Sequence, residues 1–493
     1  MRDLSQQLAD LSPAQRSLLE KRLQQQGLRL PSSLPIPQRS PAAPDNEEPL
    51  SFAQQRLWFI HQLDLNSSFY NVFSGLRLQG RLDVAVLEKA LQAVVQRHDT
   101  LRTTFTTNAE GQPVQVIQPS ATVSLVQQDL SLSGNPAAAA QQLAQQEAHG
   151  SFDLTQPLLR LTLLKLAATD HLLLVTLHHI IADRWSLGIF IQELQQLYEA
   201  LSCQQPAPLK PLPIQYADFA VWQRQWLQGL ELERQLSYWR QQLAALPVLN
   251  LPSDRPRPTV PTFQGATYPI TFAQPLADAL KNLSVQSGVT LFTVLLAAFK
   301  ILLQRYSHQN DIVVGTDIAN RNRVETEGLI GLLVNTLVLR TDLAGDPTCL
   351  ELLQRVRDGL LGAYAHQDLP FERLVAALNP ERHLSQMVPL FQVKFDLQLA
   401  PLQPLSLGDL TVHPLVFDNE TTKFELRLNL VDSEAGLRGQ VEYSTDLFER
   451  PTIARLVGHF QTLLENLVAR PQQRLSELPL LTSAERQQHQ AWN

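Results

Sequence analysis

The stretch HLLLVTLHHIIADRWSLGIFIQELQQLYEAL, residues 171–201, decides the class of fold. Residues 171–177 form a short apolar run of the length of a buried strand. Residues 186–201 place apolar side chains at helical spacing, and Ser186 is a suitable N-cap. A strand that leads directly into a helix predicts a mixed α/β fold, in which strand ends commonly display reactive groups. The polar residues between the two elements are therefore the first candidates for a functional site.

A proline-rich stretch divides the chain into two halves of similar, mixed pattern. The 493 residues correspond to two to four compact units at roughly 100–200 residues per domain. Residues 247–262 hold five prolines, which cannot continue a helix or a central strand. We expect this stretch to be the crossover between an N-terminal lobe, residues 49–246, and a C-terminal lobe, residues 263–478. Residues 1–48 are expected to form a helical arm and a linker, and residues 479–493 a second linker.

Helix-like and strand-like patterns alternate through both expected lobes. Apolar residues at helical spacing predict helices at residues 84–97, 290–306 and 350–365. Short apolar or alternating runs predict strands at residues 311–318, 334–340 and 388–397, and further strands within 424–443. Two lobes of mixed class suggest a cleft between them as the place for a site.

Composition restricts the class of protein. The formal net charge is -7 and the pI is about 6.0, which argues against a nucleic-acid binder. The two cysteines, Cys203 and Cys349, allow one disulfide at most, and we expect a reducing compartment. The sequence begins with no secretory pattern, and its most apolar stretch is shorter than a membrane span. We therefore expect a cytoplasmic protein with no membrane partner. The sequence is silent on oligomeric state, and a monomer is the default expectation.

Two histidines and an aspartate lie between the predicted strand and helix. A histidine can exchange a proton near neutral pH, and Asp183 could orient the ring or brace the loop. Adjacent histidines at a strand end can also be buried and simply hydrogen-bonded. A metal site is less favoured, because His178 and His179 point to opposite faces of a strand and no third His or Cys is near.

Six segments of the chain resemble the motifs of one family. HHIIADRWS at residues 178–186 resembles the HHxxxDGxS signature of nonribosomal peptide synthetase condensation domains. Five more segments resemble the family's other motifs, in the same order: SFAQQRLW at 51–58, RHDTLRT at 97–103, YADFAVW at 216–222, IGLLVNT at 330–336 and HQDLPFE at 366–372. The resemblance extends over about residues 49–480.

This resemblance implies a fold and a reaction. The fold would be two chloramphenicol-acetyltransferase-like lobes in a V-shaped pseudo-dimer with a central tunnel. The reaction would join a donor aminoacyl or peptidyl thioester to the amine of an acceptor aminoacyl thioester. Both would arrive on phosphopantetheine arms of upstream and downstream carrier proteins, and the domain itself would bind no cofactor. Residues 479–493 resemble the linker that leads into an adenylation domain.

The resemblance also implies roles for the residues around the signature. His179 would be the central residue, either as a general base or as the group that positions the amine, and we expect positioning to contribute more. His178 is expected to pack behind the site. Asp183 is expected to hold the loop through a distant arginine, for which Arg321 is the candidate. Ser186 is expected to cap its helix and not to act as a nucleophile.

The remaining motif residues are expected to support the site. Asn335 would either contact substrate or satisfy backbone groups at a strand end. Arg184 stands where the family usually has glycine, which predicts an ordinary backbone geometry or a side chain that reaches the tunnel beside Trp185. Residues 381–389 keep only part of the seventh motif. The residues expected to hold the fold are Arg56, Arg97, Arg102, Tyr216, Asp218 and Trp222.

Related activities are less favoured by the motifs. Heterocyclization relatives replace both signature histidines, and epimerization relatives differ at residues 334–336. The pattern is closest to domains that join two L-residues. An inactive, condensation-like platform that recruits partner proteins is a remaining alternative, although His178, His179 and Asp183 are all present.

Overall fold

The structure, a computed structural model, describes residues 35–39, 46–378, 388–399, 405–408, 410–415, 421–433 and 436–492. Most of the expected arm and linker at residues 1–48 lies outside the described residues, as do residues 381–387 of the incomplete seventh motif. The described residues fall into two compact units. Unit 1 takes its residues from Met1–Glu233, Ala319–Val334 and Leu402–Phe417, and unit 2 from Arg234–Ile318, Asn335–Pro401 and Asp418–Asn493. Two segments from the C-terminal half of the sequence therefore belong to unit 1.

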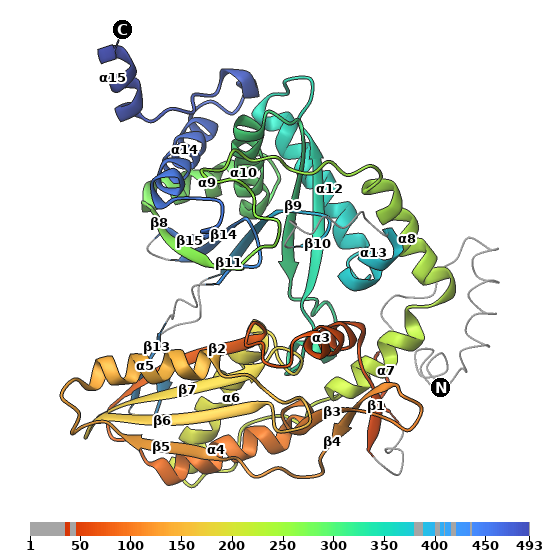
Figure 1. Cartoon of the computed structure of the whole chain (residues 1–493), viewed down its shortest axis with the longest axis vertical. Helices are drawn as coiled ribbons and strands as arrows, with labels where there is room; N and C mark the ends of the chain where they lie inside the picture. Colours follow the sequence, from red (N-terminus) through yellow and green to blue (C-terminus); the bar gives the residue numbers. More distant parts are fainter. Residues whose placement is uncertain are drawn as a thin grey trace. The chain divides into compact units, whose positions relative to one another are not determined.

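Unit 1 is built on a six-stranded sheet with the order β12-β13-β2-β7-β6-β5 (Figure 1). Its strands are β2 (Asn71–Gln79), β5 (Leu125–Asp129), β6 (Leu159–Ala167), β7 (Asp170–His178), β12 (Leu405–Leu407) and β13 (Leu410–Leu415). A smaller sheet has the order β1-β4-β3, with strands β1 (Glu47–Pro49), β3 (Thr103–Thr107) and β4 (Pro113–Ile117). β7 lies in the interior of the large sheet, between β2 and β6.

Helices cover both faces of the large sheet of unit 1. The helices of this unit are α3 (Phe52–Leu63), α4 (Val84–Arg97), α5 (Pro136–His149), α6 (Arg184–Ser202), α7 (Tyr216–Trp226) and α11 (Val324–Glu327), with the 3₁₀ turn η1 (Asp99–Arg102). Leu173 and Val175 of β7 belong to the core that α4 and α6 complete. Leu172 and Leu174 pack with alanines of α5 on the other face. This two-sided burial explains why β7 is a continuous apolar run in the sequence.

Unit 2 has its own six-stranded sheet, with the order β10-β9-β11-β14-β15-β8. Its strands are β8 (Gly265–Phe272), β9 (Asp311–Ile318), β10 (Asn335–Asp342), β11 (Val393–Leu399), β14 (Leu426–Ser433) and β15 (Gly436–Ser444). Its helices are α9 (Gln274–Gln286), α10 (Leu291–Ser307), α12 (Cys349–Ala365), α13 (Phe371–Leu378), α14 (Arg450–Ala469) and α15 (Ser483–Trp492), with the turn η2 (Leu475–Glu477). α8 (Gly229–Gln242) continues from unit 1 into unit 2. Helices α9, α10, α12 and α14 pack beside one another along this sheet (Figure 1).

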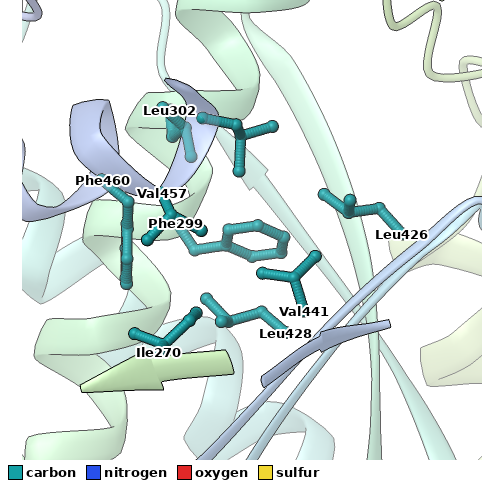
Figure 2. Close-up of a pocket in the computed structure, with 9 residues that line it drawn as sticks. Ile270, Phe299, Leu302, Leu426, Leu428, Val441, Val457 and Phe460 are labelled. Carbon is teal, nitrogen blue, oxygen red and sulfur yellow. The ribbon is translucent and has the colours of Figure 1, made fainter. Parts of the chain in front are cut away.

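The apolar core of unit 2 contains a small gap between α10, α14 and the sheet. Figure 2 shows Phe299, Phe460, Leu428 and their neighbours pointing toward one another around it. The gap has no room for a water-sized molecule and is lined only by apolar side chains. With no polar group to hold a ligand, this gap is a feature of core packing and offers no chemistry.

The mixed α/β class predicted from the sequence is confirmed, and most predicted elements are found within a few residues. The predicted helix at residues 84–97 matches α4. The strand predicted at 388–397 is shifted, because β11 begins only at Val393. Within the described ranges no single helix is long and apolar enough to cross a membrane. Helices α9 and α10 together have the length and apolar composition of a membrane span, but the pair is bent by 105°.

Candidate active site

The loop between β7 and α6 carries the two histidines and is fixed at its backbone. The His179 amide donates to the Tyr70 carbonyl at 2.7 Å. The Ile181 amide donates to the carbonyl of His178 at 3.0 Å, so the chain turns immediately after the strand. Ile180 and Ile181 are fully buried in the core that α4 and α6 share. The apolar residues inside the motif therefore anchor the loop that presents His179.

The His179 side chain is held in one orientation. Its Nδ1 lies 2.7 Å from the carbonyl oxygen of Ala182, and only a protonated Nδ1 can donate to a carbonyl. In the neutral ring this contact leaves Nε2 as the nitrogen with the lone pair. His179 is half-buried, while Ile180, Ile181 and Ala182 are completely buried. With this tautomer, Nε2 is the ring nitrogen that can accept a hydrogen bond.

His178 is the buried member of the pair. Its Nδ1 accepts a hydrogen bond from the Ile180 amide at 3.2 Å, and the side chain is almost completely buried. Strand alternation places His178 on the same sheet face as Leu172 and Leu174, the face that α5 covers. His178 is therefore part of the support behind the loop.

Asp183 is buried and saturated with hydrogen-bond donors. Its Oδ1 accepts from the amide and the hydroxyl of Ser186 at 2.8 and 2.7 Å. Its Oδ2 accepts from the amides of Leu333 and Val334, both at 3.1 Å. The Ser186 contact makes Asp183 the N-cap of α6. The prediction that Ser186 caps this helix is wrong, because α6 begins at Arg184 and Ser186 already lies inside its first turn.

Arg321 is the arginine that meets Asp183. One of its terminal nitrogens lies 3.0 and 3.3 Å from the two carboxylate oxygens, and both side chains are almost fully buried. The other terminal nitrogen donates to the carbonyls of Thr326 and Leu329, both at 2.8 Å. The hydroxyl of Ser186 joins the cluster through contacts with Arg321 and with both backbone polar groups of Gly331. The segment 319–334 is thereby tied to the start of α6.

Arg184 and Trp185 occupy the exposed side of the start of α6. Arg184 is the first helical residue, so the arginine fits an ordinary helical backbone where the family usually has glycine. Trp185 is 52% exposed, and its indole nitrogen donates to the Glu327 carbonyl at 3.3 Å. The guanidinium of Arg321 lies 5.8 Å from the centre of the Trp185 ring. Both side chains are therefore exposed at the first turn of α6.

Asn335, in unit 2, is fully occupied by backbone groups. Its amide nitrogen donates to the carbonyls of Gln367 and Leu369 at 2.8 and 2.9 Å. Its carbonyl oxygen accepts from the amides of Phe371 and Thr336 at 3.0 and 2.9 Å. Of the two expectations for Asn335, these contacts support a strand-end residue that joins β10 to the turn before α13.

The arginines of the first two motifs take part in internal polar contacts of unit 1. Arg97 and His98 donate to the two oxygens of Glu193 on α6, at 3.0 and 2.8 Å. Burial alone would raise the pKa of Glu193, but His98 and Arg97 lower it below its usual value. Arg102 contacts Asp99 and the carbonyl of Gln118. Arg56 is half-buried on α3, near enough for its charge to act on Tyr70.

The fourth motif also binds neighbouring backbone. The Tyr216 hydroxyl donates to the Leu332 carbonyl at 2.7 Å and contacts the Ser51 hydroxyl at 2.8 Å. Asp218 accepts from the amides of Gln215 and Arg39 at 2.7 and 3.0 Å. Trp222 is nearly buried, stacks on Trp226 at 5.1 Å and lies 4.5 Å from the guanidinium of Arg323. Each contact supports an architectural role.

Several supporting residues were not predicted from the sequence. Glu193 could have been suspected, because it is a charged residue among apolar positions of α6. Gly331 carries no such signal, although the Tyr216 ring lies where a Cβ at Gly331 would be. Among the residues that the structure describes, no group of three or more His, Cys, Asp or Glu side chains could hold a metal ion.

Comparison with known proteins assigns the family. The family model described as "Condensation domain" matches residues 45–489. One component of the linear gramicidin synthase from Brevibacillus parabrevis is 49% identical over 454 residues, which are 91% of this chain and 9% of that protein. The chondramide synthase cmdD from Chondromyces crocatus is 45% identical over 441 residues, which are 89% of this chain and 11% of that protein. The chain thus spans about a tenth of the length of these relatives.

The fold agrees with the same family. The X-domain from teicoplanin biosynthesis superimposes with a TM-score of 0.80 at 29% identity, over 90% of this chain and 99% of that one. The X-domain is also known in a complex with OxyB. The predicted family and enzyme class are confirmed. The chain belongs to the condensation-domain family.

Proposed function

We propose that this domain joins a donor aminoacyl or peptidyl thioester to the amine of an acceptor aminoacyl thioester, with His179 at the reacting centre. The observation that carries the proposal is the orientation of the His179 ring. Nδ1 is engaged by the Ala182 carbonyl, so Nε2 of the neutral ring carries the lone pair that can accept a proton or a hydrogen bond. An acceptor amine has the N–H group that such a nitrogen would bind.

The reaction is the aminolysis of a thioester. The lone pair of the neutral amine attacks the thioester carbonyl, and a C–N bond forms. The tetrahedral intermediate then collapses, the C–S bond breaks, and the amine proton ends on the departing thiol. His179 Nε2 would accept a hydrogen bond from the attacking N–H and orient the amine lone pair toward the carbonyl. Orientation of two bound reactants can contribute up to roughly 7–11 kcal/mol, and general base help about 10²–10⁴-fold in rate.

The buried network around Asp183 would support this role by keeping the loop in one conformation. Asp183 connects α6, Arg321 and the backbone at residues 333–334 through hydrogen bonds of 2.8 to 3.1 Å. A catalytic side chain is most effective when the groups behind it allow it little freedom. Asp183 and Arg321 are therefore proposed as residues that hold the loop, and His179 as the residue that meets the substrate.

Carrier proteins are the proposed partners. An upstream carrier would bring the donor and a downstream carrier the acceptor, each on a phosphopantetheine arm, and an adenylation domain would follow in the parent synthetase. We propose L-residues for donor and acceptor, as the motifs suggest. Arg184 and Trp185, exposed at the start of α6, are the proposed contacts for an arriving substrate.

A single-turnover assay tests the proposed reaction. Donor and acceptor carriers loaded with L-aminoacyl thioesters are mixed with the domain, and the dipeptidyl thioester is followed by intact-protein mass spectrometry. We expect product with the wild type and a rate at least about 10²-fold lower with His179→Ala. His413→Ala is the matched control, because His413 is exposed on β13. An unchanged rate with His179→Ala would contradict the central role of His179.

A second candidate function is a recruitment platform without catalysis. The structural similarity to the X-domain, which is known in a complex with OxyB, is the observation that favours it. The oriented Nε2 of His179 favours catalysis instead. If all cognate carrier pairs bind the wild type but yield no dipeptide, the platform function replaces the proposed one.

A further inference from the structure

The buried His178 ring is enclosed by two other rings, from two different parts of unit 1. His61 of α3 meets it edge to face, with ring centres 5.9 Å apart and an angle of 82°. Phe152, in the segment between α5 and β6, meets it in the same way at 6.0 Å and 79°. Edge-to-face contacts of buried rings favour a defined orientation. His61 is itself buried, with 7% of its surface exposed.

Phe152 is fixed from its other side by Arg160. The guanidinium of Arg160 lies 4.0 Å from the centre of the Phe152 ring. The same guanidinium donates to the carbonyls of Ser151, Glu147 and Gly150, at 2.9, 3.0 and 2.8 Å. These bonds hold the chain that follows α5, so Phe152 has little freedom to move away from His178.

The ring of His178 connects these contacts to the loop that carries His179. Its Nδ1 accepts from the Ile180 amide, so rotation of the His178 ring would break a hydrogen bond inside the turn. His179 lies between these two residues, and its own Nδ1 must reach the Ala182 carbonyl. We infer that His61 and Phe152 are positioning residues for His179, which act through the ring of His178. This inference rests on the proposed function of His179.

The charge state of His61 belongs to the same arrangement. Burial lowers the pKa of His61 below its usual value, against the opposing attraction of Asp153 and Asp64. Asp153, beside Phe152, and Asp64, just after α3, are the carboxylates that act on the ring, and His178 on β7 packs against it. A cation in this buried place would disturb the ring contact, so loop order should decline as the pH falls through the lowered pKa of His61.

Substitutions at the two rings test the inference in the single-turnover assay with saturating and limiting acceptor carrier. His61→Ala and Phe152→Ala are expected to lower the maximal rate about 10-fold, since small displacements at a reacting centre are costly, while the acceptor concentration for half-maximal rate is unchanged. His61→Phe keeps a buried ring that cannot titrate, and we expect it to restore most of the rate and to weaken the decline at acid pH. His171→Ala is the matched control, because His171 is a buried histidine at the other end of β7 whose pKa burial also lowers.

A second readout does not depend on catalysis. The ¹⁵N chemical shifts of the His179 ring report its tautomer, and we expect a single Nδ1–H form in the wild type and His61→Phe, but a mixture in His61→Ala. A His61→Ala domain with the wild-type rate and tautomer would overturn the inference. So would a His171→Ala domain that loses as much rate as His61→Ala, since general destabilisation would then explain both. A wild type that makes no dipeptide but shows the expected tautomers would count against the proposed function and leave the positioning result intact.

Discussion

Asp183 in unit 1 and Lys300 in unit 2 are both buried charged side chains, but the fold surrounds them differently. The Asp183 carboxylate accepts hydrogen bonds from Ser186, from the guanidinium of Arg321 and from two backbone amides. The Lys300 ammonium, on α10, is 0% exposed and donates to the Leu339 carbonyl and the Thr341 hydroxyl, at 2.8 and 2.7 Å. Neither of these two acceptors carries a charge.

The partners of a buried charge determine its effect, and these partners differ between Asp183 and Lys300. A carboxylate with many donors from separate segments fixes those segments relative to one another, and Asp183 does so for the loop that carries His179. A buried ammonium with only neutral acceptors prefers to lose its proton. Burial lowers the pKa of Lys300 to about 7, although Asp311 attracts its charge. Unit 1 therefore uses its buried charge for order, while unit 2 contains one that makes its stability depend on pH.

Removing the Asp183 charge should have the largest effect. Asp183→Asn preserves the shape of the side chain but leaves the guanidinium of Arg321 buried without its counter-charge. It also turns an amide group toward several donors. Breaking a buried ion pair on one side typically costs about 3–5 kcal/mol. We expect a loss of that size in the free energy of unfolding, measured by denaturant titration, together with a large loss of condensation rate.

A matched control separates buried from exposed carboxylates in the same unit. Asp129→Asn removes the exposed ion pair with Lys165, whose atoms lie 2.8 Å apart, and should leave the free energy of unfolding essentially unchanged. If Asp183→Asn were as stable as Asp129→Asn, the buried network would not hold the loop. The proposal that the buried charge of Asp183 orders unit 1 would then be contradicted.

A smaller effect is expected from filling the space beside Gly331. The Tyr216 ring lies where the Cβ of an alanine would be, and both backbone polar groups of Gly331 contact the Ser186 hydroxyl. Gly331→Ala should therefore push segment 319–334 away from Asp183 and cost about 2–3 kcal/mol in the free energy of unfolding. Gly188→Ala is the control, because its Cβ would meet nothing within 4 Å on α6. Helix propensity predicts that it adds up to about 1 kcal/mol, so equal losses in the two variants would contradict the steric explanation.

The sequence predicted the parts of the site that are local. Spacing and apolar runs placed a strand before His178 and a helix after Asp183, because each element depends on neighbouring residues. The N-cap of α6 was misjudged by three residues, since a serine and an aspartate are both good N-caps and spacing alone did not separate Ser186 from Asp183. Resemblance to the family suggested His179 as the central residue and Arg321 as the partner of Asp183.

The long-range parts of the site could not be predicted from the sequence. Glu193 is 95 residues from His98, yet the two form a buried hydrogen bond. His61 and Phe152 meet His178 from distant parts of the chain, and neither belongs to a motif pattern that points to the other. The return of segment 319–334 and of strands β12 and β13 to unit 1 likewise depends on tertiary packing that no local pattern records.

The smallest expected effect has the opposite sign and tests the second half of the comparison. Lys300→Met replaces the buried ammonium by an apolar chain of similar shape, and replacing buried charges in this way is often stabilising. Because the pKa of Lys300 is lowered to about 7 in the folded state, the unfolded chain binds more protons at this site between the ordinary lysine pKa and about 7. The stability of the wild type therefore decreases as the pH falls through that range and stays low below it. We expect Lys300→Met to raise the free energy of unfolding by about 2 kcal/mol at pH 6, with a gain that shrinks as the pH rises to 9.

Lys89→Met, at an exposed position of α4, should show no such pH-dependent gain. A Lys300→Met domain that is less stable than the wild type at pH 6 would mean that the Leu339 and Thr341 hydrogen bonds outweigh the cost of burying the charge, and the two buried sites would then serve the same purpose.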